Sequence, residues 1–161
     1  MTKILLSLHV LAAIIAVGPV TVAASMYPAA VRKVPVAQPA GAGEAGGPAD
    51  VSTVRLLHRI CRVYAGLGIA VPVLGFATAA AMGVLGDAWL IASITLTAAA
   101  AGLLIAFVLP RQEELLEELA GQRPVEHART ARLAMFTGLF NLLWATVTVL
   151  MIVRPGSTTG A

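Results

Sequence analysis

The chain has 161 residues, of which 58% are hydrophobic and 12% are charged, and its mean hydropathy is +0.88. This composition is far more apolar than that of a soluble globular domain and excludes that class. The formal net charge is +3, but no basic run is interleaved with aromatic residues, so a nucleic-acid partner is not expected.

Four uncharged stretches are long enough to cross about 30 Å of hydrocarbon as helices. They lie at about 4–26, 63–85, 89–109 and 133–153. We therefore predict an all-α integral membrane four-helix bundle in which residues 1–161 form a single membrane domain. The segments between these spans are too short to fold around cores of their own.

Lys and Arg are distributed unevenly between the two sides of the predicted bundle. Nine of the eleven fall in the two longer loops, and only Lys3 and Arg154 lie on the other side. Because the cytoplasmic loops of membrane proteins carry the excess of Lys and Arg, we expect both longer loops in the cytoplasm and both termini outside.

The first span carries His9 near its predicted outer end, and Met82 and Met151 are the soft side chains expected at a similar depth. Imidazole and thioether groups are ligands that haem iron and cuprous ion accept. A lone histidine near a span end more often hydrogen-bonds a carbonyl or a headgroup, so ligation by these residues is the less favoured interpretation. Pro19 and, in the second span, Pro72 predict helix kinks.

Between the first two spans, residues 35–50 are rich in Pro, Ala and Gly and are predicted to form a flexible linker. Ser52 is a suitable N-cap for the helix that follows. Arg55, Arg59 and Arg62 recur on one face of that helix, and we expect them to bind the headgroups of anionic lipids.

His58 and Cys61 lie beside these arginines, a position that indicates a wet interface for the histidine. No orienting group or oxyanion site accompanies the pair. No motif for phosphate, dinucleotide or zinc chemistry is present in the sequence. We therefore do not expect the chain to be an enzyme.

The second and third spans are joined by little more than Gly86 and Asp87, which predicts a tight antiparallel pair of neighbouring helices. Tyr27, Tyr64 and Trp89 fall close to predicted span ends. Amphipathic aromatic rings prefer such positions at the membrane interface.

After Pro110, the polar stretch 111–119 predicts a short amphipathic helix that ends near Gly121. This stretch contains four glutamates, Glu113, Glu114, Glu117 and Glu118. We expect them to face basic groups of the same loops, either Arg55 and Arg59 or Arg129 and Arg132. A divalent-cation site is the minor alternative.

The predicted spans contain no Asp, Glu, Lys or Arg, which disfavours an ion-coupled pump or carrier. Small residues recur instead at four-residue spacing, which permits close helix packing in lipid. The predicted packing residues are Gly75, Ala79, Gly83, Ala98, Gly102, Ala106 and Asn141, the last through an interhelical hydrogen bond. These small-residue faces exceed what one compact bundle needs, so one of them is expected to dock on another membrane protein.

The segment LHVLAAIIAVG at residues 8–18 resembles the opening helix of uncharacterised bacterial four-helix integral membrane proteins related to the copper-resistance D and protoporphyrinogen-oxidase J groups. His9 and Gly18 carry this resemblance, whereas Ala16 and Pro19 depart from the family pattern. The resemblance implies a haem b or copper role for His9. The Ala-rich four-span layout is also similar to accessory subunits of actinobacterial respiratory supercomplexes.

These observations favour a non-enzymatic accessory or assembly subunit that packs against a larger inner-membrane complex, with the respiratory cytochrome bcc-oxidase supercomplex as a candidate. We expect a multi-pass protein of the bacterial plasma membrane that contacts anionic lipids and takes no cofactor, nucleic acid or soluble substrate. The alternative function is a haem- or copper-binding membrane protein that uses His9 near the outer face.

Overall fold

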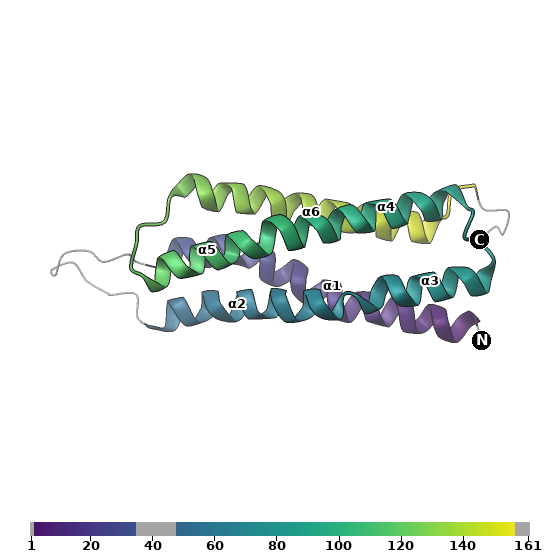
Figure 1. The fold of residues 1–161 in the computed structure, drawn as a ribbon, viewed down its shortest axis with the longest axis horizontal. Coiled ribbons are helices and arrows are strands. Elements are labelled where there is room, and N and C mark those ends of the chain that lie inside the picture. Colours follow the sequence, from purple (N-terminus) through teal and green to yellow (C-terminus); the bar gives the residue numbers. More distant parts are fainter. Residues whose placement is uncertain (1, 35–47, 157–161) are drawn as a thin grey trace.

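The computed structural model describes residues 2–34 and 48–156, except for the side chains of 48–50. Helices and no strands are found in these residues. Four helical rods, each long and apolar enough to cross a membrane, run side by side in an elongated bundle (Figure 1). The prediction of an all-helical bundle with four long apolar helices is confirmed.

The described residues form seven helical elements, which build the four rods. The first rod is α1 (Thr2–Lys33), and the second consists of α2 (Pro48–Leu67) and α3 (Ala70–Met82). The third rod joins α4 (Ala88–Leu103), the π-helical turn η1 (Leu104–Val108) and α5 (Leu109–Ala120), and the fourth is α6 (His127–Val153).

The two ends of the bundle differ in which connections they hold (Figure 1). We call the end with the α5–α6 connection, the end of α1 and the start of α2 the loop end. We call the opposite end, which holds the start of α1 and the α3–α4 connection, the turn end.

The helices extend beyond the predicted apolar spans at the loop end. The first helix continues to Lys33, past the predicted limit at residue 26, and α5 carries the third rod to Ala120. Hydropathy predicts only the apolar part of a rod. A helix continues beyond that part wherever amphipathic residues find a packing partner.

The start of α2 lies within the predicted linker 35–50. Residues 35–47 of that linker lie outside the described residues, whereas the helix begins at Pro48. Proline suits the first helical position because the N–H it lacks has no intrahelical partner there. Ser52 is consequently inside α2, and the prediction that it caps the helix is wrong.

Pro72 accounts for the interruption between α2 and α3. Proline has no N–H, and its ring clashes with the carbonyl group four residues earlier, which here belongs to Gly68. The chain turns at residues 68–69, and the N–H of Val71 donates to the Gly68 carbonyl at 3.1 Å. The predicted disturbance at Pro72 is present, whereas Pro19 lies inside the uninterrupted helix α1.

The rods pack in an order different from the one the short connection suggests. Helix α1 packs on α2, α3 and α6, and α4 packs on α6. The second and third rods meet mainly at the loop end, through α2 and α5. The prediction of a tight antiparallel hairpin is wrong for α3 and α4, which do not pack on each other, whereas the two rods do meet through α2 and α5.

The α3–α4 connection explains this separation. Helix α3 ends at Met82, so five residues rather than two connect it to α4. Gly83 adopts a left-handed φ of 72° and ends the helix, and a Cβ atom at this position would meet nothing within 4 Å. Gly83 is therefore a helix C-cap and not the packing residue we predict from its spacing.

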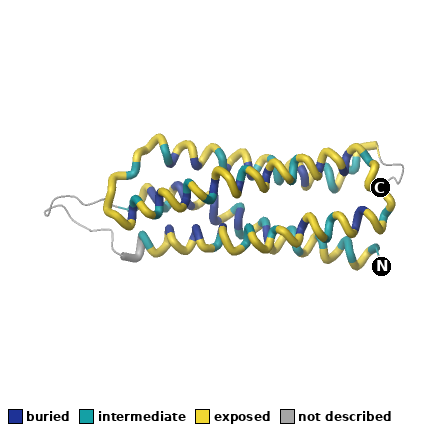
Figure 2. The backbone as a smooth tube through the Cα atoms, viewed as in Figure 1, coloured by how far each residue is buried: buried dark blue, intermediate teal, exposed yellow. Residues whose placement is uncertain are grey.

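Most of the buried apolar residues form one core in the loop-end half. It includes Tyr27 of the first rod, Val54 of the α2 part of the second, Leu104 and Leu115 of the third and Phe140 of the fourth. A second, smaller cluster at the turn end contains Ala79, Trp89 and Leu90. Outward faces are exposed along all four rods (Figure 2), and between 11% and 22% of each apolar window is buried.

Candidate functional site

Four polar side chains are buried together in the loop-end half of the bundle. Tyr27 comes from α1, His58 and Cys61 from α2, and Gln112 from α5. His58 is 8% exposed, and the other three are 0% exposed. We call these four residues the polar cluster.

The π-helical turn η1 brings Gln112 into the cluster. Ala100, Leu104, Val108 and Gln112 are buried at four-residue intervals. In an α-helix of 3.6 residues per turn, each such interval rotates the side chain by about 40°, or about 120° over the three steps. A π-helical turn holds an additional residue and takes up this drift, so all four side chains face inward.

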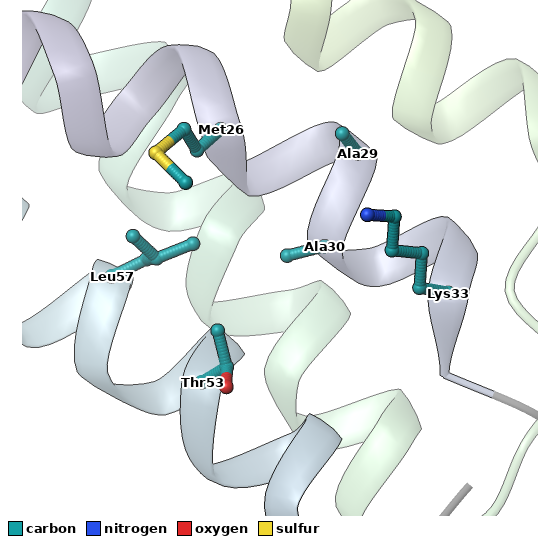
Figure 3. A pocket seen from close by; sticks show the side chains of 6 residues that line it. All are labelled: Met26, Ala29, Ala30, Lys33, Thr53 and Leu57. Atoms are coloured by element: carbon teal, nitrogen blue, oxygen red, sulfur yellow. The ribbon is translucent and has the colours of Figure 1, made fainter.

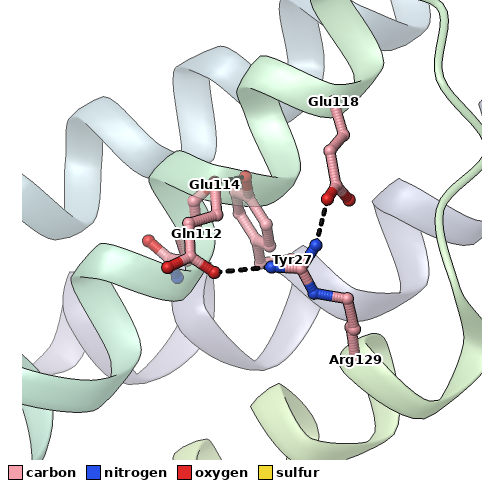
Figure 4. Close-up of polar contacts among 5 residues, drawn as sticks. All are labelled: Tyr27, Gln112, Glu114, Glu118 and Arg129. Carbon is pink, nitrogen blue, oxygen red and sulfur yellow. Dashed lines mark hydrogen bonds and ion pairs between the residues drawn. The ribbon is translucent and has the colours of Figure 1, made fainter.

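Gln112 contacts each of the other three members of the polar cluster. The Tyr27 hydroxyl donates to the main-chain carbonyl of Gln112 at 2.5 Å (Figure 4). The side-chain Oε1 of Gln112 lies 3.3 Å from Nδ1 of His58, and its Nε2 donates to Sγ of Cys61 at 3.6 Å. Because the amide oxygen is only an acceptor, Nδ1 of His58 is the donor in this contact. One residue thus links three rods.

The polar cluster bears on two sequence-based expectations. Tyr27 does not present its ring on the bundle surface, as an aromatic residue in contact with lipid headgroups would, since the ring is fully buried. The wet interface we expect for His58 is wrong, because α5 packs on α2 and covers it. Sequence reasoning misses Gln112, although its position three and seven residues before Leu115 and Leu119 places it on the apolar face of that helix.

The hydrogen-bond donors and acceptors of the polar cluster pair with one another. The thiol of Cys61 contacts the Gln112 amide, and the His58 imidazole contacts the other end of the same amide. This arrangement differs from a thiol paired directly with an imidazole base. Within residues 2–34 and 48–156, no group of three His, Cys, Asp or Glu side chains is placed to hold a metal ion.

Arg129 forms an ion-pair cluster with two glutamates of α5 (Figure 4). Its Nη2 lies 2.7 Å from Oε2 of Glu114, and its Nη1 pairs with Oε1 of Glu118. The expectation that glutamates of 111–119 face basic groups is therefore correct for Glu114 and Glu118, with Arg129 on α6 as the partner. These pairs connect α5 to α6 across the loop that joins them.

Asn141 makes the interhelical hydrogen bond that we predict. Its Nδ2 donates to Oγ of Ser25 at 3.0 Å, which joins α6 to α1. Two further buried oxygens one helical turn apart, Oδ1 of Asn141 and Oγ1 of Thr137, have no hydrogen-bond partner among the described residues.

His9 packs against α3 at the turn end. Its Nδ1 lies 3.0 Å from the Val71 carbonyl oxygen. A Cβ atom added to Gly75 would lie 2.9 Å from Cε1 of His9, so the absence of a side chain at Gly75 makes room for the imidazole. Gly75 is thus a packing residue, as the small-residue spacing predicts, and Ala79 one turn later is buried.

The three residues of the alternative ligand set lie on three different helices, His9 on α1, Met82 on α3 and Met151 on α6. Met82 follows Gly75 by seven residues, which corresponds to about 10 Å along the helix axis. Met151 packs against the small turn-end cluster of Ala79, Trp89 and Leu90. Within the described residues, the polar contact of the His9 ring is the one between its Nδ1 and the Val71 carbonyl oxygen. Joint binding of haem or copper by His9, Met82 and Met151 stays a prediction.

The small residues of the third rod have a different environment. Ala98, Gly102 and Ala106 are all exposed, and a Cβ atom at Gly102 would meet nothing within 4 Å. They lie two residues out of step with the buried Ala100, Leu104 and Val108, which corresponds to about 200° around the helix. We call these three residues the outer small-residue face, because it points away from the core.

The arginines of α2 also point outward. Arg55, Arg59 and Arg62 are exposed, whereas Val54, Leu57 and Cys61 on the other side of the same helix are buried. Helix α2 is therefore amphipathic, with its basic face on the surface at the loop end.

Comparison with known proteins gives no match. No family model matches the sequence, and the searches found no curated protein and no solved structure similar to it.

Proposed function

We propose that this protein is a non-enzymatic accessory or assembly subunit of a larger membrane complex, which it contacts through the outer small-residue face. The observation that carries this proposal is the exposure of Ala98, Gly102 and Ala106 on the side of the third rod opposite the core.

Small residues at four-residue spacing are typical of helix–helix contacts in lipid. Association there depends on van der Waals packing, and Gly or Ala lets two backbones approach closely. The contacts of α4 within the chain are made mainly with α6 and do not cover Gly102. Its open surroundings are therefore suited to a helix of another protein.

The proposed setting is the plasma membrane of a bacterium, with the loop end in the cytoplasm and both termini outside. The excess of Lys and Arg in the two longer loops supports this orientation. The similarity in size and composition to accessory subunits of actinobacterial respiratory supercomplexes makes the cytochrome bcc-oxidase supercomplex the candidate partner.

Site-specific photo-cross-linking in native membranes tests the proposal. A photoreactive amino acid replaces Ala98 in one variant and Leu142 in another, because Leu142 is an apolar residue of α6 that is 65% exposed. We expect the Ala98 variant to form a cross-link to one defined larger protein, identified by mass spectrometry. The Leu142 variant is expected to give at most a fifth of that product.

Two outcomes contradict the proposal. Equal cross-linking from both positions indicates random encounters with neighbouring proteins. A product from Ala98 that contains only a second copy of this chain indicates a homo-oligomer and not an accessory subunit.

A further inference from the structure

A crevice of about 190 Å³ lies between the end of α1 and the first turns of α2, at the loop end. It is lined by Met26, Ala29, Ala30, Lys33, Thr53 and Leu57 (Figure 3). This crevice belongs neither to the polar cluster nor to the outer small-residue face.

The crevice changes from apolar to charged along α1. Met26 lies at one end of it and Lys33 at the other, seven residues later, which corresponds to about 10 Å along the axis. Figure 3 shows the Met26 thioether beside Leu57, and the Lys33 side chain running back toward Ala29 and Ala30. The Lys33 end is the one nearer the end of the bundle.

Small side chains create the space between these two ends. Ala29 and Ala30 stand between Met26 and Lys33 on α1 and project only a methyl group each. Leu57 is buried and forms the floor, whereas Met26 is 54% exposed. The apolar end of the crevice is consequently open to the side of the bundle.

The charge around the crevice favours an anion. Lys33 lines it directly, and Arg32 and Arg55 are close in the sequence to its lining residues. Helix α1 contains no Asp or Glu, and neither do residues 51–67 of α2; Asp50 is the first acidic residue before that stretch. A basic group beside an apolar groove at the cytoplasmic end of a membrane helix is typical of contacts with anionic headgroups.

We propose that this crevice binds one anionic phospholipid. The headgroup phosphate lies at the Lys33 ammonium, and the beginning of an acyl chain lies against Met26 and Leu57. The crevice is apolar nearer the bundle centre and basic nearer the bundle end. A phospholipid matches this order, because its acyl chains lie toward the membrane centre and its anionic headgroup lies at the surface. A free phosphate ion would leave the apolar walls uncovered.

This site is distinct from the exposed arginine face of α2, and its occupation does not depend on the proposed docking of α4. Failure of one proposal therefore leaves the other intact.

Native mass spectrometry of the full-length protein tests this proposal. The protein is released from detergent that contains equal amounts of phosphatidylglycerol and phosphatidylcholine. We expect one phosphatidylglycerol per chain to be retained at an activation energy that removes phosphatidylcholine.

Two variants change the crevice by different means, and a third is the control. Lys33→Gln removes the charge, and Ala29→Phe fills the space while keeping the charge. Each is expected to lower the fraction of chains that retain phosphatidylglycerol at least fivefold. Arg132→Gln removes an equal charge from an exposed position of α6 outside the crevice and is expected to retain the lipid as the unmodified protein does.

The proposal is overturned if Lys33→Gln retains the lipid, or if Arg132→Gln loses it to the same extent. Gel filtration checks that Ala29→Phe elutes as the unmodified protein does. If this variant then keeps the lipid, the proposal is also overturned, because charge alone would explain retention. Displacement of phosphatidylglycerol by millimolar inorganic phosphate would indicate a site for the free ion instead.

Discussion

The loop-end and turn-end halves of the bundle are held together by different interactions. The loop-end half contains the main core, the polar cluster and the ion-pair cluster. The turn-end half contains the smaller cluster around Ala79, Trp89 and Leu90, together with the contact of His9 with Val71.

Under the proposed placement in a membrane, this difference has a physical cause. The loop-end helices extend past the apolar spans into water, where burial of apolar side chains is a strong driving force. The turn-end contacts lie near lipid, which is as apolar as the side chains themselves, so only packing and hydrogen bonds hold the helices together there. The comparison indicates that the loop end fixes the order of the helices.

A pair of leucine truncations tests this comparison with the largest expected effect. Leu115→Ala, in the loop-end core, is expected to lower the free energy of unfolding by about 2–4 kcal/mol, because it loses burial from water and leaves a cavity. Leu90→Ala, at the turn end, loses mainly packing and is expected to cost about 1 kcal/mol. Helicity measured by circular dichroism during titration with sodium dodecyl sulfate gives both values. A loss at Leu90 equal to that at Leu115 would contradict the comparison.

The polar cluster provides the next test. Gln112→Leu keeps the approximate volume of the side chain but removes its contacts with His58 and Cys61, and we expect a loss of about 1–3 kcal/mol of unfolding free energy. The same titration measures it. His58→Phe introduced together with Gln112→Leu replaces both partners by apolar groups, so the double variant is expected to be more stable than the sum of the two single losses. Additive losses would show that the two side chains are not coupled.

Two glycines have different surroundings: Gly75 of α3 packs against His9, whereas Gly102 of α4 faces open space. Gly75→Ala places a Cβ atom 2.9 Å from the His9 ring, and displacement of the imidazole from the Val71 carbonyl is expected to cost about 1–2 kcal/mol. Gly102→Ala meets open space and is expected to be neutral or to stabilise the helix by up to about 1 kcal/mol. Thermal unfolding in detergent compares the two variants, and a more harmful change at Gly102 would show that the chain itself covers that face.

The smallest effect is expected at the ion-pair cluster. Arg129 and Glu114 are partly exposed, so Arg129→Gln is expected to cost about 0–1 kcal/mol. In 1 M NaCl, where the screening length falls to about 3 Å, the difference between Arg129→Gln and the unmodified protein is expected to shrink. A difference that does not change with salt would indicate that Arg129 acts through packing of its side chain.

The sequence predicts the four apolar helices well, because their length and lack of charge depend on local composition alone. It also predicts the Asn141 hydrogen bond to another helix and a basic partner for the glutamates of α5. It does not predict the order of helix packing, because the two-residue connection it indicates becomes five residues once Gly83 ends α3.

The polar cluster escapes prediction for a different reason. Tyr27, His58 and Gln112 each lie where composition indicates an interface, and their burial depends on α5 packing on α2. That contact in turn depends on the rotation introduced by η1, which no residue of Leu104–Val108 signals, since all five are ordinary apolar side chains.

The π-helical turn gives the third rod one residue more than an unbroken α-helix would need to carry Ala100 and Gln112 on one face. Deleting one residue within 104–108 would leave the Gln112 side chain eleven residues after Ala100, about three α-helical turns, so Gln112 would still face the interior and Glu114 and Glu118 would still face Arg129. Adding a residue there would instead turn everything downstream by about 100°. Loss of a single codon in this pentapeptide should therefore be tolerated, whereas gain of one should uncouple the far end of the rod from both of its neighbours.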